Sequence, residues 1–353
     1  MQRIKRVEPN IHPILDEIEE AYRITSDHDT VSSGLLSPTF DRSFEQLFGV
    51  FSDYGYEDYG VEYVDKTYQP LPENDNKSLI LSFSGGKDSV ASAIKYKNDG
   101  YDVHLYHLKH INVSFFDEDK YAQRCADVLG LPIHFDEIHY SGKHIWMEHP
   151  MKNMLIANGA LSYGIREGIT TNIAFGNYYT SYLADNPFDR CAGDCMDMWG
   201  VYENIIHRVL PNFKIRCNLS NMGETLDVIS KYPEALESSL SCLCRHSLRP
   251  YRNEWVYKKF GVRLASNRCG SCYKCAIEYL YLADHNHIQY SDGYYKYCLD
   301  RLMNVYLDET GYQPKRVRDI WDRFIFYEPE KSHLYDKFDD AMVYLGGIRW
   351  EQQ

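Results

Sequence analysis

Short apolar runs alternate with stretches of helical composition along the middle of the chain. The candidate strands lie at residues 79–83, 102–106, 133–135 and 171–175, with a fifth candidate at 214–218. The helical stretches between them lie at residues 90–97, 119–129 and 147–166. Strands that alternate with helices are typical of a parallel sheet that is covered on both faces. The pattern therefore predicts an α/β fold, with a five-stranded parallel sheet and helices on both of its faces.

The segments on either side of this alternating pattern differ from it in composition. Residues 1–76 carry two candidate helices and end in a linker at 69–76, which proline interrupts and turn-forming residues dominate. Beyond about residue 195 the composition is mostly helical. We predict three parts: an N-terminal extension that caps a substrate or partner (1–76), an α/β domain (77–220) and a helical region that includes a C-terminal extension (221–353).

Charge and the N-terminus limit the classes of partner. The 353 residues include 38 Lys and Arg against 51 Asp and Glu, a formal net charge of −13. Such a surface binds phosphate backbones poorly, so nucleic acid is an unlikely partner, although a local basic patch for tRNA stays open. The N-terminus does not resemble a signal peptide, and no apolar run approaches the roughly 20 residues of a membrane helix. We expect a cytoplasmic protein whose ten cysteines are reduced thiols or metal ligands rather than disulfides.

A glycine-containing hexapeptide, Ser84-Gly85-Gly86-Lys87-Asp88-Ser89, lies between the first strand and the first helix of the α/β domain. Its glycines let backbone N–H groups approach an anion, and the following helix directs its free N–H groups to the same place. The spacing differs from the nucleoside-triphosphatase loop that ends in Gly-Lys-Ser/Thr. It resembles the pyrophosphatase loop (PP-loop), whose members split ATP between the α and β phosphates, usually with Mg²⁺.

Three cysteines repeat at a two-residue spacing in Cys269-Gly270-Ser271-Cys272-Tyr273-Lys274-Cys275. This spacing lets neighbouring sulfurs converge on a tetrahedral zinc ion, which requires a fourth ligand. Cys242 and Cys244 are the upstream candidates for that position. Four thiolates suit a closed structural zinc site better than a catalytic one. An iron–sulfur cluster and three unbound thiols are the alternatives.

The two motifs in this order resemble the 7-cyano-7-deazaguanine synthase (QueC) family. Intermediate segments are similar to family motifs as well: Tyr106-His107-Leu108-Lys109-His110, Pro150-Met151-Lys152-Asn153, Asp194-Cys195 and Ser239-Leu240-Ser241-Cys242. The resemblance covers about residues 78–280. It implies an adenine nucleotide α-hydrolase-like domain, with adenine bound beside the second strand. It also implies adenylation of the carboxylate of 7-carboxy-7-deazaguanine, attack by ammonia to give an amide, and a second ATP-driven step to a nitrile.

The resemblance implies roles for individual residues. Catalytic roles fall to Lys87, Asp88, Lys109, His110 and Lys152. The ATP site comprises Ser82, Ser84, Gly85, Gly86, Lys87, Asp88, Ser89, Tyr106 and Gly176. The deazaguanine site comprises Asn153, Tyr182 and Asp194. The zinc ligands are Cys242, in preference to Cys244, with Cys269, Cys272 and Cys275.

Several departures from the family pattern leave the acceptor of the activated carboxylate open. Lys109 and Lys152 stand where the family has arginine, and the segment after Asp194 lacks the family's arginine and glutamate. Three segments have no counterpart in a minimal family member: residues 1–76, the segment between Cys244 and Cys269, and the chain beyond about residue 280. These additional segments suggest a larger substrate or a protein partner. QueC-like enzymes of bacterial anti-phage operons attach a deazaguanine to a protein amine, so the acceptor here is either ammonia or a protein amine. A tRNA-thiolating enzyme and a catalytically inactive nucleotide-binding adaptor are the alternatives. The similar enzymes also suggest a homodimer.

Overall fold

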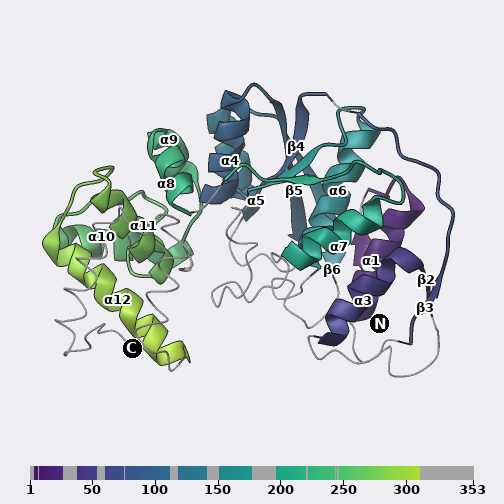
Figure 1. Ribbon diagram of the computed structural model, residues 1–353. Helices are drawn as coiled ribbons and strands as arrows, with labels where there is room; N and C mark the ends of the chain where they lie inside the picture. Colours follow the sequence, from purple (N-terminus) through teal and green to yellow (C-terminus); the bar gives the residue numbers. More distant parts are fainter. Residues whose placement is uncertain are drawn as a thin grey trace, which may run out of the picture.

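A computed structural model shows an α/β domain and a group of helices that packs beside it (Figure 1). It describes residues 4–6, 8–26, 38–53, 60–74, 76–111, 118–140, 151–176, 196–219, 222–242, 244 and 246–310.

A six-stranded sheet forms the centre of the α/β domain. Five of its strands are parallel and follow the spatial order β6-β5-β4-β7-β8. Their bounds are β4 (Ser78–Ser82), β5 (Asp102–Ile111), β6 (Ile133–Tyr140), β7 (Ile173–Phe175) and β8 (Ile215–Arg216). The predicted five-stranded parallel sheet is therefore confirmed. The chain order of the strands reverses between β4 and β7, and ligands of open α/β sheets bind beside such a reversal, outside the carboxyl ends of the strands.

Alternate side chains of each strand enter two different cores, because successive side chains of a strand point to opposite faces. On β4, Leu79 and Leu81 pack with the helices α4 (Lys87–Asn98) and α5 (Glu118–Leu129). Ile80, between them, packs into the core on the opposite face. That second core includes α6 (Lys152–Arg166), α1 (Pro13–Ser26) and α7 (Met196–Ile206). Helices cover both faces of the sheet, as the alternating pattern predicts.

Segments within residues 4–76 pack directly on the α/β domain. Strand β1 (Ile4–Arg6) pairs antiparallel with β6 and adds an edge strand that the sequence did not reveal. Helix α1 lies against α6, where the Asn158 side chain donates a 2.8 Å hydrogen bond to the Leu15 carbonyl. The remaining elements are β2 (Thr39–Asp41), η1 (Arg42–Phe44), α3 (Glu45–Asp53) and β3 (Glu62–Val64). The cap function of residues 1–76 stays a prediction.

The described residues beyond β8, which end at Thr310, are mostly helical, as predicted. Its elements are α8 (Met222–Ser230), α9 (Pro233–Ser238), η5 (His246–Leu248), α10 (Arg249–Phe260), α11 (Tyr273–Asp284) and α12 (Asp292–Thr310). Helix α10 has proline in its first turn and ends at Gly261, which adopts the left-handed conformation (φ 75°) common after helices. Helices α8 and α9 pack on α4 and α5 and so join this region to the sheet. Within the described residues, no helix combines the length and the apolar character needed to cross a membrane.

Candidate functional site

The hexapeptide forms a tight loop between β4 and α4, at the carboxyl edge of the sheet. Gly85 adopts a left-handed backbone conformation (φ 71°). A Cβ atom at this position would lie 2.6 Å from the Ala122 nitrogen and 2.8 Å from the Tyr121 carbonyl oxygen. Both are backbone atoms of α5, which cannot move aside as a side chain can. Glycine is therefore required here both by conformation and by space.

Polar groups of this loop are arranged around the first turn of α4. The Gly86 N–H donates to Ser84 Oγ (3.2 Å), and Ser89 Oγ donates to the Gly86 carbonyl (3.0 Å). The two serine hydroxyls lie 3.5 Å apart. Among the described residues, no group accepts a hydrogen bond from the backbone N–H of Asp88 or Ser89. These two donors at a helix N-terminus are suited to bind a phosphate.

Lys87 and Asp88, the predicted catalytic pair of the loop, contact each other. The Lys87 side chain is only 7% exposed. Its Nζ lies 2.8 and 2.9 Å from the two carboxylate oxygens of Asp88. The lysine charge is therefore paired with Asp88 within the loop.

Gly176 follows β7, on the other side of the strand reversal from Ser82, the last residue of β4. A Cβ atom on Gly176 would lie 2.3 Å from Ser89 Cα and 2.6 Å from its nitrogen. The end of β7 thus packs directly on the first turn of α4. The structure brings together the predicted ATP-binding residues of the loop and Gly176.

The predicted site residues of β5 lie in different environments. Tyr106 is fully buried, and its hydroxyl donates to Asp136 Oδ2 (2.9 Å) in the core on the α6 face. The Tyr106 side chain therefore packs within the core, and its contact with adenine stays a prediction. Lys109 is exposed and forms a 3.4 Å ion pair with Glu137 on β6. His110 belongs to β5, but its side chain lies outside the described part of the structure.

A second group of charges forms where α5, α6 and α11 begin. Two lysine charges act electrostatically on Glu118 at the start of α5: that of Lys152, a predicted catalytic residue, and that of Lys274, which lies between two of the cluster cysteines. Burial raises the pKa of Glu118, and the two lysine charges oppose this shift. Asn153, a predicted substrate residue, is buried beside Lys152. The other two, Tyr182 and Asp194, lie outside the described residues.

The sequence analysis did not select Glu118 or Lys274. The first-turn acids of α5 were visible as Glu118-Asp119, but such residues are common at helix starts. No local pattern indicates that the charge of Lys274, 156 residues later in the chain, acts on Glu118. His107 was also missed, although it belongs to the quoted Tyr106–His110 segment.

His107 supports the phosphate loop from the neighbouring strand. Its ring is buried, and Nδ1 donates a 2.8 Å hydrogen bond to the carbonyl of Phe83, directly before the loop. A carbonyl can only accept, so the neutral ring carries its proton on Nδ1. Burial lowers the pKa of His107, against a smaller opposing effect of the hydrogen bond to Phe83.

The predicted cysteine cluster is present. The sulfurs of Cys242, Cys269, Cys272 and Cys275 all lie within 4.8 Å of one another, and Cys244 is not part of this group. Four thiolates at about 2.3 Å from a tetrahedral zinc ion are separated by roughly 3.8 Å. The observed distance of 3.9 Å between Cys242 Sγ and Cys272 Sγ fits this geometry. These four residues can therefore hold a zinc ion.

Hydrogen bonds around the cluster favour thiolate ligands. The backbone N–H groups of Cys244 and Ser271 donate to the sulfurs of Cys242 and Cys269, each at 3.3 Å. Such bonds stabilise negative sulfur, which is the form that binds a metal.

A backbone bridge connects the phosphate loop with the cysteine cluster. The Leu240 N–H donates to the Gly85 carbonyl (2.7 Å), and the Leu240 carbonyl accepts from the Lys87 N–H (3.1 Å). Leu240 lies two residues before Cys242. The two motifs recognised separately in the sequence therefore belong to one continuous structure.

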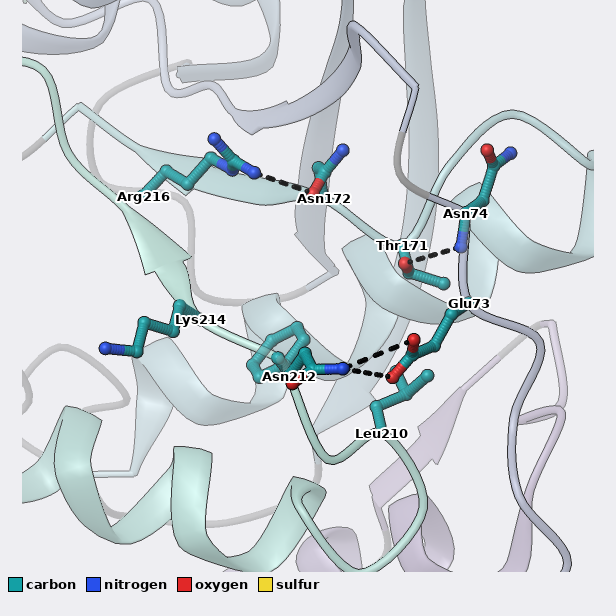
Figure 2. Close-up of a pocket in the computed structure, with 9 residues that line it drawn as sticks. Glu73, Asn74, Thr171, Asn172, Leu210, Asn212, Lys214 and Arg216 are labelled. Carbon is teal, nitrogen blue, oxygen red and sulfur yellow. Dashed lines mark hydrogen bonds between the residues drawn. The ribbon is translucent and has the colours of Figure 1, made fainter.

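A polar cavity lies at the opposite edge of the sheet. It has a volume of about 330 Å³, and its lining includes Thr171 and Asn172 directly before β7 and Lys214 directly before β8. Figure 2 shows hydrogen bonds within its wall, from Arg216 to Asn172 and from Asn212 to Glu73. None of the predicted site residues lines it. The loop, and not this cavity, is the candidate active site.

A short segment of the chain is similar to an enzyme of known function. No family model matches the chain. Over 61 residues it is 38% identical to the tRNA-specific 2-thiouridylase MnmA of Sulfurimonas denitrificans, which is 17% of this chain and 18% of that enzyme. A predicted subunit of a tRNA methyltransferase from Methanocaldococcus jannaschii aligns over 46% of this chain and 91% of its own, at 20% identity. The TM-score of 0.20 is too low to indicate a shared fold. The loop and the short match to the thiouridylase support a nucleotide-using enzyme of the PP-loop type.

Proposed function

We propose that this protein is an ATP-dependent ligase that adenylates the carboxylate of a 7-deazaguanine and releases AMP and pyrophosphate. The phosphate loop carries the proposal, because its free N–H groups lie at the carboxyl edge of the sheet where the strand order reverses. The order of the loop, the intermediate motifs and the cysteine cluster supports 7-carboxy-7-deazaguanine as the substrate.

The reaction requires positioning and stabilisation of charge. A substrate carboxylate oxygen attacks the α-phosphorus of ATP, and the bond from this phosphorus to the bridging oxygen of pyrophosphate breaks. The N–H groups of Asp88 and Ser89 and the hydroxyl of Ser84 would bind the departing pyrophosphate, and Mg²⁺ held there would supply further positive charge. An amine then attacks the acyl carbon, and AMP leaves with the electrons of the acyl–oxygen bond.

Lys152, Asn153, Glu118 and Lys274 are the candidates for the substrate side of this site. They lie at the starts of three helices, and both lysine charges act electrostatically on Glu118. A lysine charge favours the bound carboxylate, and Glu118, whose pKa burial raises, is suited to accept a proton from the attacking amine. The amine is either ammonia or a protein amine. Zinc, bound by the four cysteines, has a structural role in this proposal.

The direct test incubates the protein with Mg²⁺–ATP and 7-carboxy-7-deazaguanine, with ammonia or candidate proteins as acceptors. We expect AMP and pyrophosphate only when the carboxylate is present, and an amide, a nitrile or a mass increase on a protein in the mass spectrum. Guanine, which lacks the carboxylate, is the matched control substrate. Ser89→Ala should lower the rate, whereas Ser92→Ala, one turn further along α4, should not. Failure to release pyrophosphate with any acceptor would exclude the proposal.

A second candidate, transfer of sulfur to tRNA, rests on the short match to a tRNA-specific 2-thiouridylase. This function also uses adenylation, with a base carbonyl oxygen in place of the carboxylate. It predicts ATP cleavage that depends on tRNA and a sulfur donor, together with salt-sensitive tRNA binding. Thiolated nucleosides in digests of the treated tRNA would establish it over the deazaguanine reaction.

A further inference from the structure

We infer that Arg249 is a positioning residue that couples zinc at the cysteine cluster to ATP at the phosphate loop. The inference rests on the proposed binding of ATP and zinc, but on no particular substrate of the ligase. Arg249 is the first residue of α10 and is 1% exposed, which is unusual for an arginine.

The guanidinium of Arg249 joins the cysteine segment to α5 through three hydrogen bonds. Its Nε donates to the Cys244 carbonyl (2.8 Å), and one terminal nitrogen donates to the carbonyl of the ligand Cys242 (3.3 Å). The other terminal nitrogen donates to the hydroxyl of Tyr121 on α5 (2.9 Å). One planar side chain therefore holds the cysteine segment and α5 at a fixed separation.

Tyr121 transmits this restraint to the phosphate loop. Its backbone is one of the surfaces against which Gly85 packs with no room for a Cβ atom. On the other side of the loop, the Leu240 bridge connects Gly85 and Lys87 with the chain that leads to Cys242. The loop is thus held between two supports, and both depend on where the cysteine segment lies.

Zinc makes the position of both supports dependent on the metal. Cys242 is one of the four zinc ligands, and its carbonyl accepts a hydrogen bond from Arg249. It also lies two residues after Leu240, whose backbone contacts Gly85 and Lys87. A zinc ion that fixes the Cys242 sulfur therefore restricts the segment from Leu240 to Cys244 to one arrangement, and zinc loss removes this restriction.

Two ligands that stabilise one arrangement must strengthen each other by the same factor. We expect zinc to raise the affinity for Mg²⁺–ATP about tenfold, within the usual range of such couplings. Mg²⁺–ATP should raise the affinity for zinc by an equal factor. Calorimetric titration of the apo and zinc-loaded protein measures the first factor, and equilibrium competition with a chromogenic zinc chelator, with and without Mg²⁺–ATP, measures the second.

The decisive variant is Tyr121→Phe, which removes one hydroxyl and leaves the zinc ligands, Arg249 and the loop in place. We expect both ligands to bind while the coupling factor falls to about 2, because the hydrogen bond from Arg249 to α5 is lost and only the contact of its guanidinium with the aromatic ring (5.7 Å) remains. Arg249→Lys, which keeps the charge but not the planar fork, should give a similar loss. Lys258→Met, on the exposed side of α10, is the control and should retain full coupling.

Three outcomes separate this inference from the proposed function. If the wild-type protein binds no Mg²⁺–ATP, the proposed function fails and the coupling fails with it. If it binds ATP with the same affinity with and without zinc, only the coupling is overturned. Full coupling in Tyr121→Phe would show that Arg249 is not the link, even if Arg249→Lys does not fold.

Discussion

The phosphate loop and the cysteine cluster have similar backbones and opposite chemistry. Each contains a glycine in the left-handed conformation, Gly85 at φ 71° and Gly270 at φ 69°, and each leads into a helix. The loop presents main-chain N–H groups, which suit an anion, whereas the cluster presents side-chain thiolates, which suit a cation. Function at the loop therefore depends mainly on backbone geometry, whereas function at the cluster depends on side-chain identity.

The neighbours of the two glycines differ in the same sense. A Cβ atom at Gly85 would meet backbone atoms of α5 at 2.6 Å. At Gly270 it would meet the ends of side chains, those of Leu264 and Val256 at 2.7 Å and of Tyr294 at 2.8 Å. Side-chain ends can shift where backbone cannot. The two sites should therefore respond differently to equivalent changes.

The largest effect is expected from removal of a cluster sulfur. Cys275→Ser should abolish stoichiometric zinc binding and destabilise the helical region by several kcal/mol, because structural zinc contributes directly to folding. Cys244→Ser is the matched control, since Cys244 is buried nearby but lies outside the group of four. Elemental analysis of the purified variants measures zinc, and urea unfolding measures stability. Loss of zinc from Cys244→Ser but not from Cys275→Ser would contradict the assignment of the ligands.

The next largest effect is expected from alanine substitution at the two glycines. Gly85→Ala should weaken Mg²⁺–ATP binding by up to roughly a hundredfold, because a methyl group against the α5 backbone displaces the loop at an overpacking cost of about 1–3 kcal/mol. Gly270→Ala should instead lower the free energy of unfolding by about 1–3 kcal/mol, the usual cost of overpacking, with a smaller effect on ATP. Calorimetry and denaturant unfolding separate the two quantities.

Gly100→Ala is the control for backbone strain, because it changes a left-handed glycine without creating a steric clash. Gly100 has a similar conformation (φ 79°), but no atom lies within 4 Å of the Cβ position. Gly100→Ala should therefore show only the strain of a left-handed alanine, about 1–2 kcal/mol. Equal loss of ATP affinity in Gly85→Ala and Gly100→Ala would mean that contact with α5 does not shape the loop.

Local sequence patterns were sufficient for much of this architecture. The apolar runs predicted the five parallel strands, and the glycine and cysteine spacings located both motifs, because each depends on neighbours in the chain. Strand β1 could not be predicted, since three residues carry no signal for pairing with β6 over 130 positions later. The electrostatic effect of Lys274 on Glu118 and the Leu240 bridge likewise depend on tertiary packing. Successive side chains of β5 point to opposite faces of the sheet, so Tyr106 and His107 lie on different faces. This alternation could have indicated from the sequence that His107 lies on the same face as the loop.

A smaller effect is expected at the second support of the loop. Gly176→Ala would place a methyl group against the Ser89 backbone without left-handed strain. We expect ATP binding to weaken about tenfold, because the added methyl group would press on the Ser89 backbone but carries no cost of left-handed strain. Gly200→Ala in α7, where the Cβ position is open, should be neutral or slightly stabilising because alanine favours helices. Unchanged ATP affinity in Gly176→Ala would show that β7 does not contribute to the loop.

The smallest effect is the pH dependence of the free energy of unfolding that arises from His107, which supports the loop through the Phe83 carbonyl. Because burial holds the pKa of His107 below its ordinary value of 6.5, the unfolded chain takes up a proton before the folded protein does. The stability contributed by neutral His107 is therefore present above pH 6.5 and declines as the pH falls below it. Between pH 7.5 and 5.5 this decline is at most about 1.4 kcal/mol, the equivalent of one pH unit.

His107→Asn tests this dependence, because the asparagine amide can still donate to the Phe83 carbonyl but does not titrate. The variant should lose less stability than the wild type between pH 7.5 and 5.5 in urea unfolding followed by circular dichroism. Zinc-loaded samples of both proteins share any acid effect on the cysteine cluster, so the difference between them reports His107 alone. An identical decline in both proteins would mean that His107 takes up its proton at the same pH in the folded and unfolded states. At acid pH the hydrogen bond to Phe83 would then support the loop with a charged ring, and the contrast between a loop held by neutral main-chain contacts and a cluster held by charge would no longer apply.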